Sequence, residues 1–315
     1  MKINFFYNLK KIFNKIEVLF IRHSAVDSNI FLLNKNHDHI RSILLYFPDY
    51  EMMHFGDHLF FEPLAKYLNM GGYQVTIAPV KHMEFYFRDL GYRVKSEGHF
   101  DDIDLIITRV EFIKALRRSK KQVLFIDTAS SKIERHLCND MIEKVSQFLG
   151  MSNVGYDPIP SYPDSLGIEN LSFLNMEKKY IVFNNYVDSG SVRVGSRHQK
   201  ILIDFIKELK VKTGFDVIHT GSIKDKASDS RFYDFVDIDA RGETSVRDLF
   251  ALCSLGNVLL NVSFDGLQMH LFFMKNKKSF ILFRGRFLKK NADYIKKYVN
   301  PPFFTDSIND IIEYI

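Results

Sequence analysis

The sequence predicts an α/β protein built from two consecutive lobes, each with a parallel sheet. Short runs of β-branched and aromatic residues alternate with stretches of helical periodicity, a pattern typical of βαβ units. The alternation stops once, at the proline-rich residues 156–163 (YDPIPSYP), and then begins again. The chain has 315 residues, 46% hydrophobic and 26% charged, which is enough for two globular domains.

In the first half, short apolar runs predict strands and the segments between them predict helices. The helix over 59–68 contains Pro63, which is tolerated near the first turn, and Gly71-Gly72 ends it. The strands are expected at 42–47, 73–80, 104–108 and 122–126, and the helices at 59–68, 82–90 and 131–149.

The second half repeats this pattern. In the helix over 196–212, the spacing of Ile201, Phe205 and Leu209 predicts a buried face. Such paired α/β halves are Rossmann-like, and their ligands bind beyond the carboxyl ends of the strands and commonly between the lobes. The strands are expected at 180–184, 215–219, 257–261 and 279–283, and the helices at 196–212, 246–254 and 267–274.

These elements predict four parts along the chain. A basic amphipathic extension spans 1–40, the first lobe 41–160, the second lobe 161–290 and a helical tail 291–315. Residues 1–20 interleave apolar residues with lysines, so this segment is either a helix packed on its own domain or one that lies on an anionic membrane face. A signal peptide is not expected, because lysines interrupt any apolar core.

Composition excludes several classes of protein. The net charge of +5 is too small to indicate nucleic-acid binding, although it suits anionic substrates. The two cysteines form no CxxC pattern, which excludes a disulfide framework, disfavours a structural zinc site and indicates a reducing, cytoplasmic compartment. No apolar run approaches the ~20 residues that a membrane-spanning helix needs.

Three loops follow predicted strands and carry the residues suited to chemistry. In the first (HFGDH, 54–58), Gly56 permits a tight turn, and Asp57 is either a general base or an N-cap. The second (NNYVDSGSVRVGSR, 184–197) offers small residues and arginines, as a phosphate site or as a solvated loop. In the third (NVSFDGLQMH, 261–270), Asp265-Gly266 opens a helix whose N–H groups suit a diphosphate, and His270 contacts either ligand or core.

Two further segments end strands or lie between them. His219-Thr220-Gly221-Ser222 follows a strand, where it either lines the same cleft or forms a simple turn. The Asp-Ile-Asp at 237–239 lies in a polar stretch, and we expect a solvated turn there rather than a metal site.

Together these loops resemble the heptosyltransferase-like glycosyltransferases, glycosyltransferase family nine. GDHLFFEPL (56–64) resembles the family's glycine-aspartate element with its apolar, proline-containing helix, and DGLQMHL (265–271) resembles its acidic-Gly…Met-His element. GETSVRDL (242–249) and TGS (220–222) resemble two elements that lie between them. The resemblance covers about residues 41–285.

The resemblance implies the GT-B fold, with two Rossmann-like lobes whose parallel sheets face a central cleft. It implies an inverting, metal-independent transfer without a bound cofactor, with Asp57 as the base and with Gly56 and His58 beside the acceptor. Arg193 or Arg197 would stand where the family has a lysine. The implied donor site comprises Asn184, Ser189, Gly190, Ser191, Arg193, Thr220, Gly221, Thr244, Asp265, Gly266 and His270.

The implied partners are a nucleotide-diphosphate sugar and a bacterial surface glycan such as lipopolysaccharide or capsule. Separately, the basic segment 1–20 predicts weak peripheral contact with the cytoplasmic face of the inner membrane. Two other functions stay open. One is a catalytically inactive sugar-nucleotide-binding or scaffold protein of a polysaccharide-assembly complex, and the other is a nucleotide-sugar epimerase.

Overall fold

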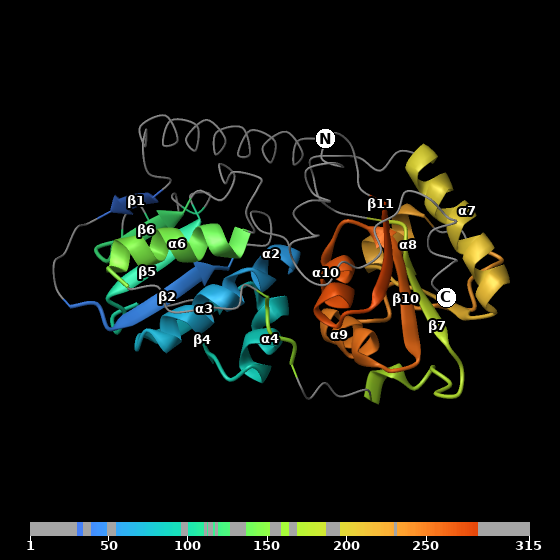
Figure 1. The fold of residues 1–315 in the computed structure, drawn as a ribbon, viewed down its shortest axis with the longest axis horizontal. Helices are drawn as coiled ribbons and strands as arrows, with labels where there is room; N and C mark the ends of the chain where they lie inside the picture. The colour runs from blue at the N-terminus through green and yellow to red at the C-terminus, as the bar shows by residue number, and fades with distance from the viewer. Residues whose placement is uncertain are drawn as a thin grey trace. The chain divides into compact units, whose positions relative to one another are not determined.

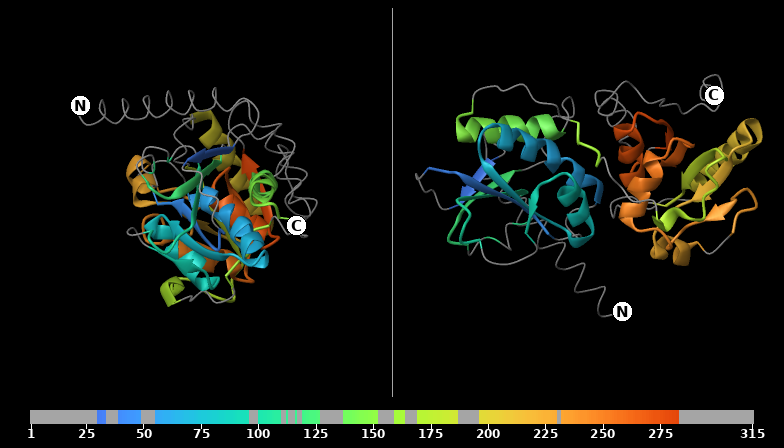
Figure 2. Two further views of the ribbon diagram at one scale, coloured as in Figure 1. Left: turned by 90° about the vertical axis from the view of Figure 1, so that its left-hand side faces the viewer. Right: turned by 90° about the horizontal axis from the view of Figure 1, so that it is seen from below.

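The computed structural model describes most of both halves of the chain. The chain divides into two compact units, residues 1–160 and 161–315 (Figures 1 and 2). The expected amphipathic segment 1–20 and the expected tail 291–315 lie outside the described residues. The described residues are 30–33, 39–48, 55–95, 100–109, 112, 116, 119–126, 137–151, 159–163, 169–186, 196–229 and 232–282.

The first unit contains a sheet of five parallel strands and one antiparallel edge strand (Figure 1). The strand order is β1-β6-β5-β2-β3-β4. The four strands expected from the sequence are present, as β2, β3, β5 and β6. The strands are β1 (Ile30–Leu33), β2 (Ser42–Phe47), β3 (Gln74–Pro79), β4 (Arg93–Val94), β5 (Leu105–Arg109) and β6 (Gln122–Ile126).

Strand β1 corrects the expectation that residues 1–40 precede the first sheet. It pairs antiparallel with β6, with Ile30 opposite Ile126 and Leu33 opposite Val123. Four apolar residues are too few to show a periodicity, and their pairing partner lies about 90 residues away in the sequence. The open edge of β6 therefore decides that this segment is a strand.

The helices of the first unit are α2 (Phe55–Leu59), α3 (Phe61–Met70), the 3₁₀ helix η1 (Lys81–Met83), α4 (Glu84–Asp89) and α6 (Leu137–Leu149). The helix expected over 59–68 is α3, and Pro63 lies in its first turn. Helices α3 and α6 lie side by side (Figures 1 and 2), where the hydroxyls of Tyr67 and Ser146 share a hydrogen bond of 3.0 Å. The ring of Phe61 packs on Phe47 of β2 at 4.3 Å between centroids, so α3 covers one face of the sheet.

The second unit contains a five-stranded parallel sheet in the order β11-β10-β7-β8-β9. Strand β9 shows that the solvated turn expected at 237–239 is wrong, because Ile238 and Asp239 pair with Ile218 and His219 of β8. Two residues are too few for an alternating pattern. The strands are β7 (Tyr180–Asn184), β8 (Asp216–His219), β9 (Ile238–Asp239), β10 (Val258–Phe264) and β11 (Lys278–Leu282).

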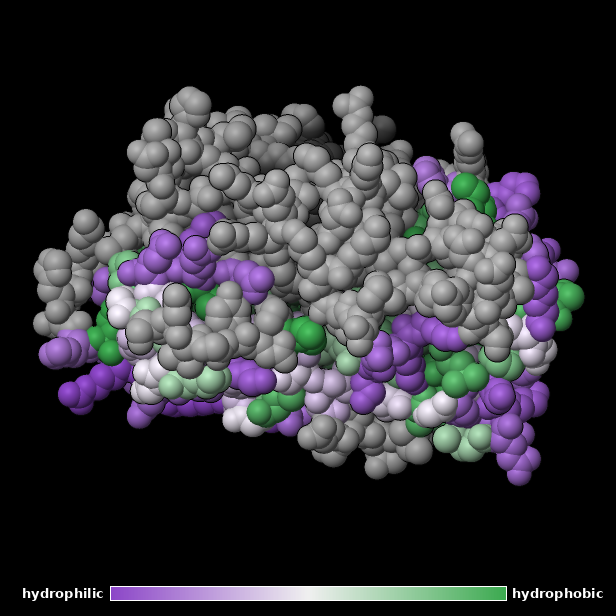
Figure 3. Space-filling model, in the orientation of Figure 1, coloured by the Kyte–Doolittle hydropathy of each residue, from purple (hydrophilic) through white to green (hydrophobic). Residues whose placement is uncertain are grey.

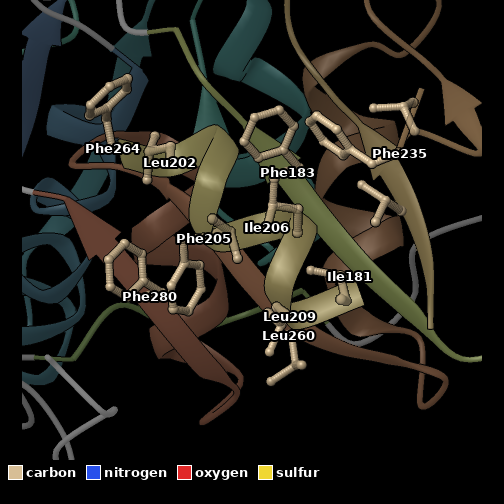
Figure 4. Close-up of a cluster of buried hydrophobic side chains, with 13 residues drawn as sticks. Ile181, Phe183, Leu202, Phe205, Ile206, Leu209, Phe235, Leu260, Phe264 and Phe280 are labelled. Carbon is tan, nitrogen blue, oxygen red and sulfur yellow. The ribbon is translucent and has the colours of Figure 1, made fainter. Parts of the chain in front are cut away.

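Helix α7 covers one face of this sheet through an apolar stripe (Figure 4). Phe205 of α7 stacks on Phe280 of β11 at 3.9 Å between ring centroids. Ile201, expected on the buried face, is 41% exposed, because the stripe toward the sheet runs one residue later. The described surface over α7, on the right of Figure 3, is mostly hydrophilic. The buried stripe of α7 comprises Leu202, Phe205, Ile206 and Leu209.

The remaining helices of the second unit are the 3₁₀ helix η3 (Glu169–Leu171), α8 (Ile223–Ser228), α9 (Val246–Ser254) and α10 (Leu267–Met274). Helix α10 packs on β10 and β11. Alternate residues of β10 pack against α7, whereas Asn261 of the same strand bonds to α10. Because neighbouring residues of a strand point to opposite faces, α7 and α10 cover opposite faces of the sheet.

Both units share one doubly wound topology. When the five parallel strands of each unit are numbered along the chain, both sheets have the order 3-2-1-4-5. The order reverses direction between β2 and β5 in the first unit and between β7 and β10 in the second. Ligands of such sheets bind at the carboxyl ends of the strands that flank this switch point. In each unit, a ligand is therefore expected at this edge of the sheet.

Candidate active site

An ion pair marks the switch point of the first unit. Asp57 lies in α2, which follows β2, and Arg109 is the last residue of β5, the strand beside β2. The Arg109 Nη1 atom lies 3.5 Å from Asp57 Oδ2. The side chains are 14% and 35% exposed respectively, so the carboxylate stays accessible while the guanidinium is mostly covered. The pair can hold a carboxylate in place at the edge where a ligand is expected.

Asp57 is inside the first turn of α2, so its alternative as an N-cap is wrong. Gly56 is helical as well, so the tight turn expected there is also wrong. His58 is fully buried, with its ring 5.1 Å from that of Phe47. His58 therefore packs against Phe47 of β2 in the core, and Asp57 is the more accessible of the two.

In the second unit, Asn184 ends β7 and connects it to the loop after β8. Its Nδ2 donates to the Thr220 carbonyl oxygen at 3.1 Å, and its Oδ1 accepts from the Tyr186 N–H at 2.8 Å. These two hydrogen bonds fix the backbone just before the loop in which a phosphate site is expected. Of the residues predicted in that loop, Ser189, Gly190, Ser191 and Arg193 lie outside the described residues, and Arg197 is the second residue of α7.

A buried chain of polar side chains spans this switch point. The Thr220 hydroxyl donates to Gln268 Oε1 at 2.7 Å, and Gln268 Nε2 donates to Asn261 Oδ1 at 2.6 Å. None of the three residues is more than 5% exposed. Gln268 had no predicted role, although a polar residue in the apolar helix LQMHLFFM was a usable signal.

Asp265 and Gly266 follow β10, and Gly266 is the N-cap of α10. Both residues are partly exposed. The first-turn N–H groups of α10 therefore begin at the carboxyl edge of the sheet, where such groups favour an anion. His270, in the same helix, is only 9% exposed, which fits a core position better than a surface contact.

His219 lies in a second buried polar cluster at the end of β8. Its Nε2 is 2.9 Å from Asn185 Oδ1, and Asn185 Nδ2 donates to Tyr233 Oη at 3.1 Å. Burial, with a further contribution from the charge of Arg241, lowers the pKa of His219 to about 3. The imidazole is therefore neutral near pH 7, and it acts as a hydrogen-bonding group.

Arg241 supports this cluster from the loop after the neighbouring strand β9. Its guanidinium is paired with Asp239 through Nε at 2.8 Å and Nη2 at 2.9 Å, and its Nη1 donates to the Asp229 carbonyl oxygen at 2.6 Å. Hydrogen bonds from Arg241 hold the pKa of Asp239 below its usual range. Arg241 is only 2% exposed, so it holds the loop after β9 in place rather than offering a free charge.

Two further predicted donor-site residues, Gly221 and Thr244, belong to the loops after β8 and β9. Gly221 and Gly242 meet through a hydrogen bond of 2.8 Å from the Gly242 N–H to the Gly221 carbonyl oxygen. A Cβ at Gly221 would lie 2.9 Å from Asp225 Oδ2, so a side chain there would displace the carboxylate that accepts from the Ser222 N–H. The Thr244 hydroxyl donates to the Ala240 carbonyl oxygen at 3.3 Å. Thr244 therefore stabilises the turn before α9.

The structure thus connects Asn184 and Thr220 directly and joins them through Gln268 to α10, two residues after Gly266. Sequence reasoning missed Gln268, Asn185 and Arg109. Among the described residues, no three His, Cys, Asp or Glu side chains are grouped to hold a metal ion. No described helix is long and apolar enough to cross a membrane.

Two doubly wound units of one strand order define the GT-B class of fold, as the sequence resemblance implied. No family model matches the chain, and no curated protein matches it. The chain is similar in structure to a family 9 glycosyl transferase from Veillonella parvula, with a TM-score of 0.58 and 13% identity over 90% of this chain and 93% of that one. It is also similar to ADP-heptose LPS heptosyltransferase II from E. coli, with a TM-score of 0.59 and 12% identity over 87% of this chain and 97% of that one. These likenesses confirm the predicted fold and match the resemblance to family nine at the level of fold.

Proposed function

We propose that the protein is a glycosyltransferase that uses a nucleotide-diphosphate sugar as donor. The observation that carries the proposal is the chemistry at the two switch points. The first unit presents an accessible carboxylate, Asp57, and the second presents a helix start, Asp265-Gly266, linked to polar loops. An acceptor hydroxyl needs a base, and a departing diphosphate needs hydrogen-bond donors.

In the proposed reaction, the Asp57 carboxylate takes the proton of the acceptor hydroxyl as its oxygen attacks the anomeric carbon. The bond from that carbon to the diphosphate breaks, the configuration inverts, and the nucleoside diphosphate leaves with the bonding electrons. The main-chain N–H groups of α10 and one of the arginines 193 and 197 would stabilise the leaving charge without a metal ion.

The proposed acceptor is a bacterial surface glycan, such as a lipopolysaccharide or capsule precursor. This rests on the likeness in fold to a protein described as an ADP-heptose LPS heptosyltransferase. We further propose that residues 1–20 attach the protein to the cytoplasmic face of the inner membrane. Liposome co-sedimentation with and without these residues tests this, and equal binding by both forms would contradict it.

The first test is thermal unfolding against ADP, GDP, UDP, CDP and their common sugar conjugates. A ligand at about 100 times its dissociation constant adds roughly 2.7 kcal/mol of stability. We expect one nucleotide to stabilise the protein selectively and so to name the donor class. If no nucleotide raises the unfolding temperature, the result would contradict donor binding and would favour a scaffold role.

The second test is Asp57→Asn, with Asp101→Asn as a matched control on an exposed carboxylate before β5, at the opposite edge of the same sheet. Asp57→Asn should keep the stabilisation by nucleotide and lose transfer by about 10²–10⁴-fold, the usual contribution of a general base. The control should keep both. Retained transfer in Asp57→Asn would show that another group is the base. An epimerase would instead convert the donor sugar with no acceptor present.

A further inference from the structure

The strand β10 has two chemically different faces. Leu260, Val262 and Phe264 pack into the apolar cluster under α7. Asn261 and Ser263 alternate with them and point to the face that α10 covers; they are 1% and 2% exposed. Polar side chains buried under an apolar helix need hydrogen-bond partners, since each unsatisfied group costs about 1–3 kcal/mol.

Gln268 is the partner that α10 provides, and both ends of its amide are hydrogen-bonded. Oε1 faces the Thr220 hydroxyl, which lies closer to it (2.7 Å) than to the Phe183 carbonyl oxygen (3.2 Å). Nε2 faces Asn261 Oδ1 at 2.6 Å, and Asn261 Nδ2 in turn donates to Ser263 Oγ at 3.2 Å. Each of these contacts pairs a donor with an acceptor, and because the Thr220 and Ser263 hydroxyls can donate or accept, Gln268 can be reversed only together with Asn261.

These contacts join three strands around the switch point. Thr220 follows β8, Asn261 lies in β10, and Asn184, at the end of β7, donates to the Thr220 carbonyl oxygen. Gln268 itself is the second residue of α10. A displacement of its side chain would therefore change the spacing between the first turn of α10 and the loop after β8, which are the two sides of the proposed donor site.

We infer that Gln268 is a positioning residue of the donor site, which holds the first turn of α10 against the Thr220 loop so that both bind the nucleotide diphosphate. This inference rests on the proposed function. Gln268 acts through Thr220 and α10, and it is not itself assigned a contact with substrate. The buried amide thus serves binding geometry in addition to stability.

Two substitutions test this role. Gln268→Glu keeps the shape but replaces the donor that faces Asn261 Oδ1 with a carboxylate oxygen, and it buries a charge. Gln268→Met keeps the length and removes both hydrogen bonds. The matched control is Tyr180→Phe, which removes two hydrogen bonds, from the Asn175 N–H (2.8 Å) and to its carbonyl oxygen (3.1 Å), at the opposite end of β7.

The measurements are the dissociation constant of the nucleoside diphosphate that stabilises the wild type, the KM for donor and for acceptor, and the stability of each variant. We expect both Gln268 variants to weaken nucleotide binding and raise the donor KM by about tenfold or more, with the acceptor KM unchanged. Tyr180→Phe should lower stability and leave both constants near the wild type.

Wild-type nucleotide affinity in both Gln268 variants, or an equal loss in Tyr180→Phe, would overturn the inference while leaving the proposed function intact. A wild type that binds no nucleotide would refute the proposed function and the inference together. If a Gln268 variant does not fold, Thr220→Val removes the hydroxyl alone. It should also weaken nucleotide binding selectively, and unchanged binding there would overturn the inference.

Discussion

Buried His219 should make the second unit lose stability as the pH falls below neutrality. The pKa of His219 is about 3 in the folded protein, first because burial disfavours the charged imidazole and second because Arg241 is near. Asp239 and Asp229 oppose this shift only in part. An unfolded histidine titrates near 6.5. Between these two values the unfolded chain binds a proton that the folded chain does not, so lower pH favours unfolding.

The size of the effect follows from the protonation of the unfolded state. Between pH 7 and pH 5, one histidine with a pKa of about 6.5 when unfolded and far below 5 when folded removes about 2 kcal/mol of stability. A pKa of His219 one unit higher in the folded protein would barely change this loss of stability, because the folded imidazole would still be mostly neutral at pH 5. The loss is a large fraction of the 5–15 kcal/mol typical of a domain.

The informative variant is His219→Gln, whose amide nitrogen can take the place of Nε2 beside Asn185 and cannot titrate. Urea unfolding at pH 5, 6 and 7, followed by hydrogen exchange of peptides from β7 and β8, reports the second unit specifically. The wild type should lose about 2 kcal/mol more than the variant between pH 7 and pH 5. His82→Gln, which removes a solvent-exposed imidazole, is the control and should keep the wild-type dependence.

The decisive quantity is the difference in slope between wild type and variant, because the chain contains 11 histidines. An identical dependence on pH in the wild type and in His219→Gln would refute the reasoning. It would mean that the folded protein protonates His219 at pH 5 without cost, contrary to the burial of its side chain.

Two further predictions concern the loop after β9. Asp239→Asn leaves the buried Arg241 guanidinium without its carboxylate and should cost about 3–5 kcal/mol in urea unfolding; a loss below about 1 kcal/mol would show that the guanidinium finds another partner. Gly242→Ala places a Cβ 2.9 Å from Ile223 Cδ1 at a residue whose φ is 74°, so it should destabilise by more than about 1 kcal/mol. Gly256→Ala, where a Cβ meets nothing within 4 Å, is the control, and an equal loss in both would contradict the steric argument.

The regular elements were predictable where the local pattern was long enough. The apolar runs at 42–47 and 180–184 became β2 and β7 with the predicted bounds, and the helix expected at 246–254 became α9. Strands β1, β4 and β9 were missed because they contain only two to four residues and depend on neighbours distant in the sequence. The misplacement of Ile201 has a related cause, since helical spacing shows that a face is buried but not its angle to the sheet.

In the candidate site too, residues with a local signal in the sequence were predictable, and contacts between distant segments were not. Asp57 and Asp265-Gly266 were found because each follows a predicted strand, and that information is local. Arg109 also follows a predicted strand, but its contact with Asp57 depends on β2 and β5 being neighbours. The assignment of Asp57 as the base and of the donor-site residues stays a prediction that the proposed variants test.

By itself, the sequence determined the alternation of strands and helices, the ends of several helices, and the loops that follow strands. These features depend on residues within one or two turns of each other, so their periodicity is visible in the chain. Only the tertiary structure decided the strand order, and with it which loops meet at each switch point. The same order buries Gln268, His219 and Arg241 beside their partners, because hydrogen bonds between distant segments form only once the sheet has brought them together.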